Sequence, residues 1–220
     1  MRHLSTSRCA FVALLLAAAP AVSPSPARGQ LRGLPVFFDP TYSYDTRAGV
    51  DVGHGGEAGG TAIAVTASRL YQTGNCKRVA VSGGVGTLNP RGGDFETHLM
   101  AGALASVLVN PCPRPTSISN PTFRVFAGAG AVHGENGTVA DLPIGVGAGY
   151  MVPLAIGRIE VWATPRAHYR GSLPPLGHRG WDFAVSGGLN IGVASLGGVR
   201  AALDCCEGGV GVGYGFSLWF

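Results

Sequence analysis

The segment from Arg158 to Arg170 constrains the fold most strongly, because polar and apolar residues alternate along it. The even positions hold Arg158, Glu160, Trp162, Thr164, Arg166, His168 and Arg170, and the odd positions hold Ile159, Val161, Ala163, Pro165, Ala167 and Tyr169. A period of two indicates a strand with two different faces. The segment is longer than a usual soluble strand of about 5–6 residues and suits a tilted bilayer-spanning strand, which needs about 9–11. Since a lipid-facing arginine at the midplane costs about 2–4 kcal/mol, we expect the even face to line a lumen.

The same alternation recurs along the chain and predicts ten strands, separated by turn residues. They span residues 47–54, 61–71, 77–88, 95–109, 122–133, 141–152, 156–170, 181–194, 198–205 and 210–220. An even strand number is typical of single-chain outer-membrane barrels. The sequence therefore predicts an all-β fold, a transmembrane antiparallel up-and-down β-barrel of about ten strands. Eight strands are the alternative, if segments merge.

Composition excludes several other classes of protein. Charged residues make up only 13% of the chain, against about 25% in an average soluble domain. The apolar fraction of 46% excludes a disordered chain, and past residue 30 no apolar run approaches the roughly 18 residues of a membrane-spanning helix. A soluble secreted β-sandwich remains the competing fold. It would bury the apolar stripes that a barrel turns toward lipid.

The first residues have the layout of a secretory signal peptide. Arg2 and Arg8 precede an uncharged apolar run. Small residues after this run allow cleavage after Ala21, Ala27 or Gly29, and we prefer the last of these sites. Three parts are then expected: a signal peptide at 1–29, a periplasmic N-terminal segment at 30–46 and the outer-membrane barrel at 47–220. Removing the signal leaves a nearly balanced charge, and Lys77 is the only lysine. Without a basic run, we expect no nucleic-acid partner.

The predicted C-terminal strand has apolar residues at alternate positions, namely Val212, Tyr214, Phe216, Leu218 and Phe220. This pattern resembles the insertion signal of Gram-negative outer-membrane barrels. Segments 125–132 and 144–150, with glycine at alternate positions, look like the small OmpA/OmpX/opacity-type barrel superfamily. This resemblance covers roughly residues 47–220 and departs from that group in strand number, which is typically eight. It implies export to the cell outer membrane, insertion by the barrel-assembly machinery through Tyr214, Phe216, Leu218 and Phe220, and lipid as the surrounding partner.

The ionisable residues at predicted inward positions are balanced, with seven arginines and seven carboxylates. They are Arg47, Asp51, Arg78, Asp94, Glu96, Arg124, Asp141, Arg158, Glu160, Arg166, Arg170, Asp182, Arg200 and Asp204. Balance favours mutual pairing across a narrow lumen, whereas a selective channel more naturally displays one sign. We therefore expect a largely filled lumen and a structural or surface-interaction role. Inward glycines such as Gly128 and Gly145 remove volume, so a narrow passive channel is the alternative.

No catalytic site is predicted, and we expect no enzyme activity and no cofactor. A second alternative rests on Asp94, Glu96 and His98, which share one face near the outer end of the fourth predicted strand. That cluster would suit a surface hydrolase similar to the ten-stranded omptin proteases. The omptin pattern sets an acidic pair against an Asp-His dyad, and this chain has no second Asp-x-His. Metal binding is not expected either, because the predicted rim histidines, His54, His133 and His178, lie in separate loops without ligand spacing.

Cysteines divide between the two predicted sides of the membrane. Cys76 and Cys112 fall in periplasmic turns, where a disulfide is plausible if the turns are adjacent. Cys205 and Cys206 fall in the last outer loop, as a strained vicinal bridge or as thiols. We expect the barrel to be a monomer.

Overall fold

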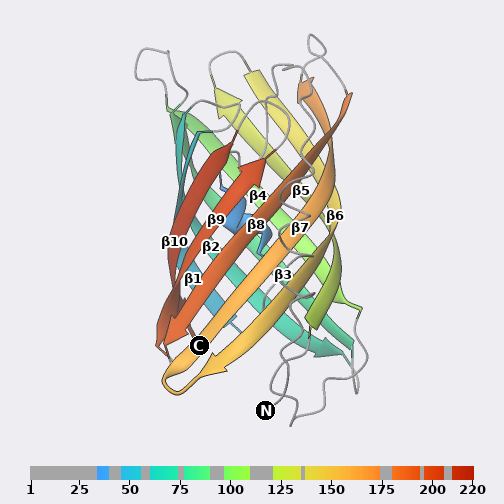
Figure 1. Cartoon of the computed structure of the whole chain (residues 1–220). Coiled ribbons are helices and arrows are strands. Elements are labelled where there is room, and N and C mark those ends of the chain that lie inside the picture. Colours follow the sequence, from blue (N-terminus) through green and yellow to red (C-terminus); the bar gives the residue numbers. More distant parts are fainter. Residues whose placement is uncertain are drawn as a thin grey trace.

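Ten antiparallel strands form one closed sheet in the described part of the computed structural model (Figure 1). The structure describes residues 34–39, 46–55, 60–73, 77–89, 97–109, 121–134, 137–173, 180–193, 196–205 and 210–220. The strands are β1 (Thr46–Gly55), β2 (Thr61–Thr73), β3 (Lys77–Asn89), β4 (His98–Leu108), β5 (Pro121–Gly134), β6 (Gly137–Leu154), β7 (Gly157–Leu173), β8 (Gly180–Val193), β9 (Gly197–Cys205) and β10 (Gly211–Trp219). A 3-10 helix, η1 (Pro35–Phe38), precedes them. The predicted all-β up-and-down barrel is confirmed, with ten strands rather than eight.

The barrel closes between its first and last strands. The β1–β10 register runs from Arg47 opposite Trp219 to Gly55 opposite Gly211. Two backbone hydrogen bonds extend this seam, from Thr46 N to Phe220 O at 3.3 Å and from Phe220 N to Thr46 O at 3.0 Å. Closure leaves no sheet edge to pair with other chains. The competing β-sandwich is therefore wrong, because the described strands belong to one closed sheet and not to two packed sheets.

The two ends of the barrel are named by the connections that mark them. The end with Phe220 and the turn at residues 155–156 between β6 and β7 is called the turn end, and the opposite end is called the loop end (Figure 1). The shortest strands, β9 and β10, have 9 residues each. That length is still enough for a tilted strand to cross a bilayer, which takes about 9–11 residues.

One connection is shorter than the sequence predicts. Residues 134–140 were expected to form a loop, but β6 begins at Gly137 and leaves only residues 135–136 between β5 and β6. The pairing of β5 with β6 continues to Gly134 and Gly137. Beside this pair, His133 Nδ1 lies 2.8 Å from Thr138 Oγ1 on the opposite strand. The backbone of Gly137 has a φ of 111°, which side chains other than glycine disfavour. Glycine thus permits a tighter hairpin than hydropathy indicates.

The two faces of the barrel wall have opposite chemistry. The outward face is covered by exposed Val, Ile, Leu and aromatic side chains on every strand, such as Val65 and Phe183. The inward face buries ionisable side chains, including Asp51 and Asp141. Soluble proteins arrange these residue types the other way round. Within the described residues, no helix is long and apolar enough to cross a membrane.

Aromatic side chains gather near both ends of the outward face. Tyr71, Phe123, Tyr150, Phe216 and Phe220 lie toward the turn end. Toward the loop end, the rings of Tyr169 and Trp181 lie 5.4 Å apart.

Among the described side chains, Arg69 is the one arginine or carboxylate on the outward face. It lies opposite Thr46, at the turn end, and its guanidinium lies 5.3 Å from the centre of the Tyr71 ring. A cation can rest over an aromatic face in this way.

Candidate functional site

The lumen contains a segment of the chain itself, Leu34–Asp39, which we call the plug. It includes η1, drawn in blue inside the barrel in Figure 1. Phe37 N donates to Leu34 O at 3.0 Å, and the side chains of Leu34, Phe37, Phe38 and Asp39 are buried. The sequence predicts a periplasmic segment at residues 30–46. Of this segment the structure describes residues 34–39, which lie between the strands with Leu34, Phe37 and Phe38 buried.

An apolar cluster on β2 to β5 packs against the plug. The buried cluster that joins Leu34, Phe37 and Phe38 includes Ala62, Ala64, Leu88, Met100, Leu104, Phe126 and Val132. The Phe38 ring lies 5.9 Å from the Phe37 ring and 6.2 Å from the Phe126 ring. Burying an apolar side chain of this size stabilises by roughly 1.5–3 kcal/mol. Hydrophobic contact therefore holds one side of the plug.

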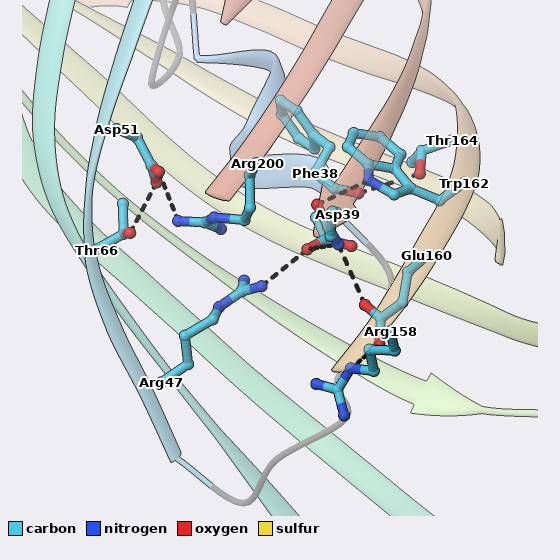
Figure 2. A network of polar contacts seen from close by, with 11 residues as sticks. Phe38, Asp39, Arg47, Asp51, Thr66, Arg158, Glu160, Trp162, Thr164 and Arg200 are labelled. Carbon is cyan, nitrogen blue, oxygen red and sulfur yellow. Dashed lines mark hydrogen bonds and ion pairs between the residues drawn. The ribbon is translucent and has the colours of Figure 1, made fainter. Parts of the chain in front are cut away.

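Asp39 faces the polar side of the lumen (Figure 2). Its Oδ2 accepts hydrogen bonds from Arg47 Nη1 at 2.8 Å and from Asn190 Nδ2 at 2.9 Å. The Asp39 side chain has no exposed surface. A buried carboxylate is stable only when charged or polar donors surround it, and β1 and β8 supply them here.

The contacts of Asp39 continue into a chain of polar residues on β7 and β8 (Figure 2). Asn190 Nδ2 also donates to Glu160 Oε2 at 3.3 Å, and Trp162 Nε1 donates to Asn190 Oδ1 at 3.4 Å. Arg158 Nε lies 2.9 Å from Glu160 Oε1, and the Arg158 guanidinium lies 4.8 Å from the centre of the Trp219 ring. The carboxylate of the plug is thus one member of a continuous polar network.

Phe38 links the apolar and polar sides of the lumen. Thr164 Oγ1 donates to the Phe38 carbonyl at 3.1 Å. The Arg166 guanidinium lies 3.9 Å from the centre of the Phe38 ring, and the His168 ring meets that ring edge to face at 6.0 Å. A cation over a ring face, shielded from water, is attracted by the ring quadrupole.

Arg166 is the centre of a second polar cluster, nearer the loop end. Its Nη2 lies 2.6 Å from Asp204 Oδ2, and its Nη1 donates to the Ser186 hydroxyl. Ser186 Oγ in turn donates to Asp204 Oδ1 at 3.1 Å. Arg166 Nε donates to His168 Nε2 at 2.7 Å. The guanidinium therefore uses its donors in several directions and crosslinks β7, β8 and β9.

The hydrogen bonds of His168 define which of its nitrogens carries a proton. Arg166 Nε–H can only donate, so His168 Nε2 accepts, and His168 Nδ1 then donates to Asp141 Oδ2 at 3.2 Å. Both ring nitrogens are engaged. Ser186, the nearby hydroxyl, is bonded to Arg166 and Asp204 rather than to the imidazole. The cluster holds strands together and does not form the nucleophile and base geometry of a triad.

Another buried ion pair joins β1 to β9. Arg200 Nη2 lies 2.5 Å from Asp51 Oδ1, and Thr66 Oγ1 donates to Asp51 Oδ2 at 2.8 Å (Figure 2). Closer to the loop end, Arg170 Nη1 lies 2.7 Å from Asp182 Oδ2. The first pair spans β10, and the second joins the adjacent strands β7 and β8.

The predicted lumen residues for which the structure is described face the interior of the barrel. They are Arg47, Asp51, Arg78, Arg124, Asp141, Arg158, Glu160, Arg166, Arg170, Asp182, Arg200 and Asp204. Most are brought together in the ion pairs above, and Arg170 also lies 3.5 Å from Asp141. Arg124 donates instead to the Ser106 hydroxyl at 3.4 Å, and Arg78 is half-buried near the turn end. Arg47 pairs with Asp39, a carboxylate outside the predicted set.

Several predicted residues lie outside the described residues. They are Asp94, Glu96, Cys76, Cys112, Cys206 and His178. Of the predicted hydrolase cluster only His98 is described, and a Cβ added at Gly134 would touch its ring. Cys205 is half-buried at the end of β9. Within the described ranges, no group of three or more His, Cys, Asp and Glu side chains is placed to hold a metal ion.

Neighbouring side chains occupy the space beside two of the inward glycines, Gly128 and Gly145. A Cβ added at Gly128 would collide with Leu104, and one at Gly145 would lie 2.7 Å from the Phe126 ring. One cavity, lined in part by Phe38 and Leu104, measures about 10 Å³. This volume is close to the ~10–15 Å³ that a single water needs.

Sequence reasoning missed the two plug residues that organise the lumen, Phe38 and Asp39. A signal was available, because the apolar run from Leu34 to Phe38 lies outside any alternating segment and still needs cover from water. Asn190 lies at an inward position of the alternation in its strand, but nothing in the sequence assigns it a role, because an amide carries no charge to balance. Its role depends on three partners that the barrel brings together.

Neither a protein-family model nor a curated protein sequence matches the chain.

Proposed function

We propose that the chain is an integral outer-membrane β-barrel whose lumen is closed by its own N-terminal segment and by paired charges. Its role is structural or surface-interacting rather than enzymatic, and it works as a monomer surrounded by lipid. The observation that carries the proposal is the exposed apolar belt on every strand, combined with an interior that buries arginines and carboxylates. Lipid is the solvent that favours this arrangement, because it replaces water on the outward face.

The ends of the barrel support the same placement. Aromatic side chains of outer-membrane barrels collect at the two membrane interfaces, and here they lie toward both ends. Arg69 lies at the turn end, where a lipid-face arginine costs only about 0–1 kcal/mol. The signal-like residues 1–29 and the C-terminal alternation support export and insertion by the barrel-assembly machinery. With this orientation, the turn end lies in the periplasm.

The paired charges support a filled lumen more than an ion-selective pore. Arg166 of β7 pairs with Asp204 of β9, and Arg200 of β9 pairs with Asp51 of β1, so each ion pair spans one intervening strand and stiffens the wall. A narrow passive channel remains the second candidate function, because the plug is a separate short segment that the wall surrounds. The two candidates differ in what happens when the plug is weakened.

We expect the wild-type barrel to be silent in planar-bilayer recordings. Replacing Leu34, Phe37 and Phe38 with serine removes the apolar contacts that hold the plug, so openings are expected to appear. A matched triple serine variant at Ile63, Val65 and Val85, which lie on the outward face, is the control and is expected to stay silent. Stable wild-type steps would favour the channel instead. Silence in the plug variant would show that the wall side chains close the lumen without the plug.

A further inference from the structure

We propose that the place in the lumen now filled by Phe38 and Asp39 is a binding site for a free ligand that joins one carboxylate to an apolar body. The plug then acts as a tethered competitor for this ligand. The inference rests on the proposed barrel and assigns a ligand class to its lumen. A free aliphatic acid and a free aromatic acid share this chemistry, and the test below separates them.

The carboxylate position is built from two donors on different strands. Arg47 of β1 and Asn190 of β8 both donate to the same oxygen of Asp39, at 2.8 and 2.9 Å. The Asp39 side chain is completely buried, so these bonds are made in a site that excludes water. Charge-assisted hydrogen bonds are short and strong in such surroundings. Any carboxylate that reaches this point can take the same bonds.

The apolar position lies directly beside it. The Phe38 ring rests between the Arg166 guanidinium at 3.9 Å and the Phe126 ring at 6.2 Å, and Met100 and Leu104 belong to the same buried cluster. Such a pocket combines apolar walls with a few convergent polar groups. That combination is typical of small-molecule sites. It accepts an aromatic ring or an aliphatic chain, provided that a carboxylate is attached.

The charge next to this position also favours an anion. Asp39 supplies the carboxylate that pairs with Arg47. When the plug leaves, an incoming carboxylate can form the same ion pair, whereas an uncharged molecule of the same shape cannot.

The plug can compete without being a permanent part of the wall. Phe38 and Asp39 contact the strands through their side chains and through the Phe38 carbonyl, which accepts from Thr164. Asp39 is separated from Arg47 by only 8 positions in the chain. A short tether gives an effective concentration in the millimolar range, so the plug masks the site from weak free ligands. Weakening the plug is expected to reveal it.

The test titrates the full-length barrel in detergent with 3-phenylpropionate and with octanoate, and follows tryptophan emission. Trp162 reports on the site because its Nε1 donates to Asn190. The variant Phe38→Ala/Asp39→Ala is expected to bind at least one of the two acids about tenfold more tightly than wild type, because the competitor is removed. The acid that binds more tightly identifies the body as aromatic or aliphatic. The matched amides, 3-phenylpropionamide and octanamide, are expected to bind about tenfold more weakly than their acids.

Two further variants distinguish specific recognition of the carboxylate by Arg47 from non-specific binding of the ligand. In the Phe38→Ala/Asp39→Ala background, Arg47→Gln is expected to weaken binding of the acid about tenfold. Arg124→Gln removes another inward arginine, on β5, and is expected to leave the affinity within about twofold. If the double variant does not show the heat-dependent migration of a folded barrel, Asp39→Asn takes its place in the same titrations.

Three results would overturn the inference. They are equal binding of acids and amides, equal effects of the two arginine variants, and wild-type affinity as high as that of the plug variant. Failure of the proposed barrel has a different signature. In that case the wild-type chain would show no heat-dependent migration and would not fractionate with membranes, whatever its affinity for acids.

Discussion

An arginine at Ile144 is expected to destabilise the barrel by about 2–4 kcal/mol, because this side chain lies on the outward face near mid-height. Ile144 pairs with Ala127 in the middle of β5 and with Ala167 of β7, and 47% of its surface is exposed. The measurement is urea unfolding of the refolded protein in lipid vesicles. A soluble barrel would respond differently, since surface substitutions there usually stay within ±0.5 kcal/mol.

Leu154 provides a matched control on the same strand and the same face. It is 46% exposed, but it pairs with Gly157 at the turn end, where a bilayer gives way to headgroups and water. Leu154→Arg is therefore expected to lose only about 0–1 kcal/mol. A difference between the two positions reports depth in a membrane. Equal, small effects at both would indicate that the outward face meets water.

Replacing Asp51 with alanine is expected to destabilise the barrel by about 3–5 kcal/mol, because it leaves the Arg200 charge buried without its carboxylate. The two side chains are almost completely buried, and Thr66 also loses an acceptor. The same urea titration in vesicles measures this loss. We expect Asp51→Ala/Arg200→Met to recover most of it, because exchanging a whole buried ion pair for apolar groups is often nearly neutral.

The pair of Arg170 and Asp182 is the control for this prediction. Its N–O distance of 2.7 Å is similar, but both side chains keep some access to solvent near the loop end. Asp182→Ala is therefore expected to lose no more than about 1 kcal/mol. If Asp51→Ala and Asp182→Ala have the same effect, the lumen around Arg200 is hydrated and not closed.

The strands of the barrel wall could be predicted from the sequence, because the face on which each residue lies follows from its position within its own strand. In β7, the alternation from Arg158 to Arg170 places every even residue inside, and the structure agrees. A period of two is a property of one strand, so it survives without knowledge of the neighbours. The hairpin between β5 and β6 shows the limit. There the connection has only two residues, because Gly137 adopts a positive φ, whereas the hydropathy pattern predicts a longer loop.

The site was harder to predict because it depends on contacts between distant parts of the chain. Asn190 and Asp39 are separated by 151 positions, and Thr164 and Phe38 by 126. Which arginine meets which carboxylate is decided by barrel closure and stagger, as for Asp51 and Arg200. The plug itself has four helical residues and no periodicity, so no local pattern marks it. Only the need to bury Phe37 and Phe38 pointed toward the lumen.

Heat-dependent migration of the outer-membrane fraction on SDS gels tests the central claim most directly. A closed, lipid-facing barrel resists SDS at room temperature, so we expect the unboiled protein in that fraction to run as a compact form that boiling converts to a slower one. Recovery of the protein in soluble form from the periplasm, with the same migration before and after boiling, would contradict the membrane assignment.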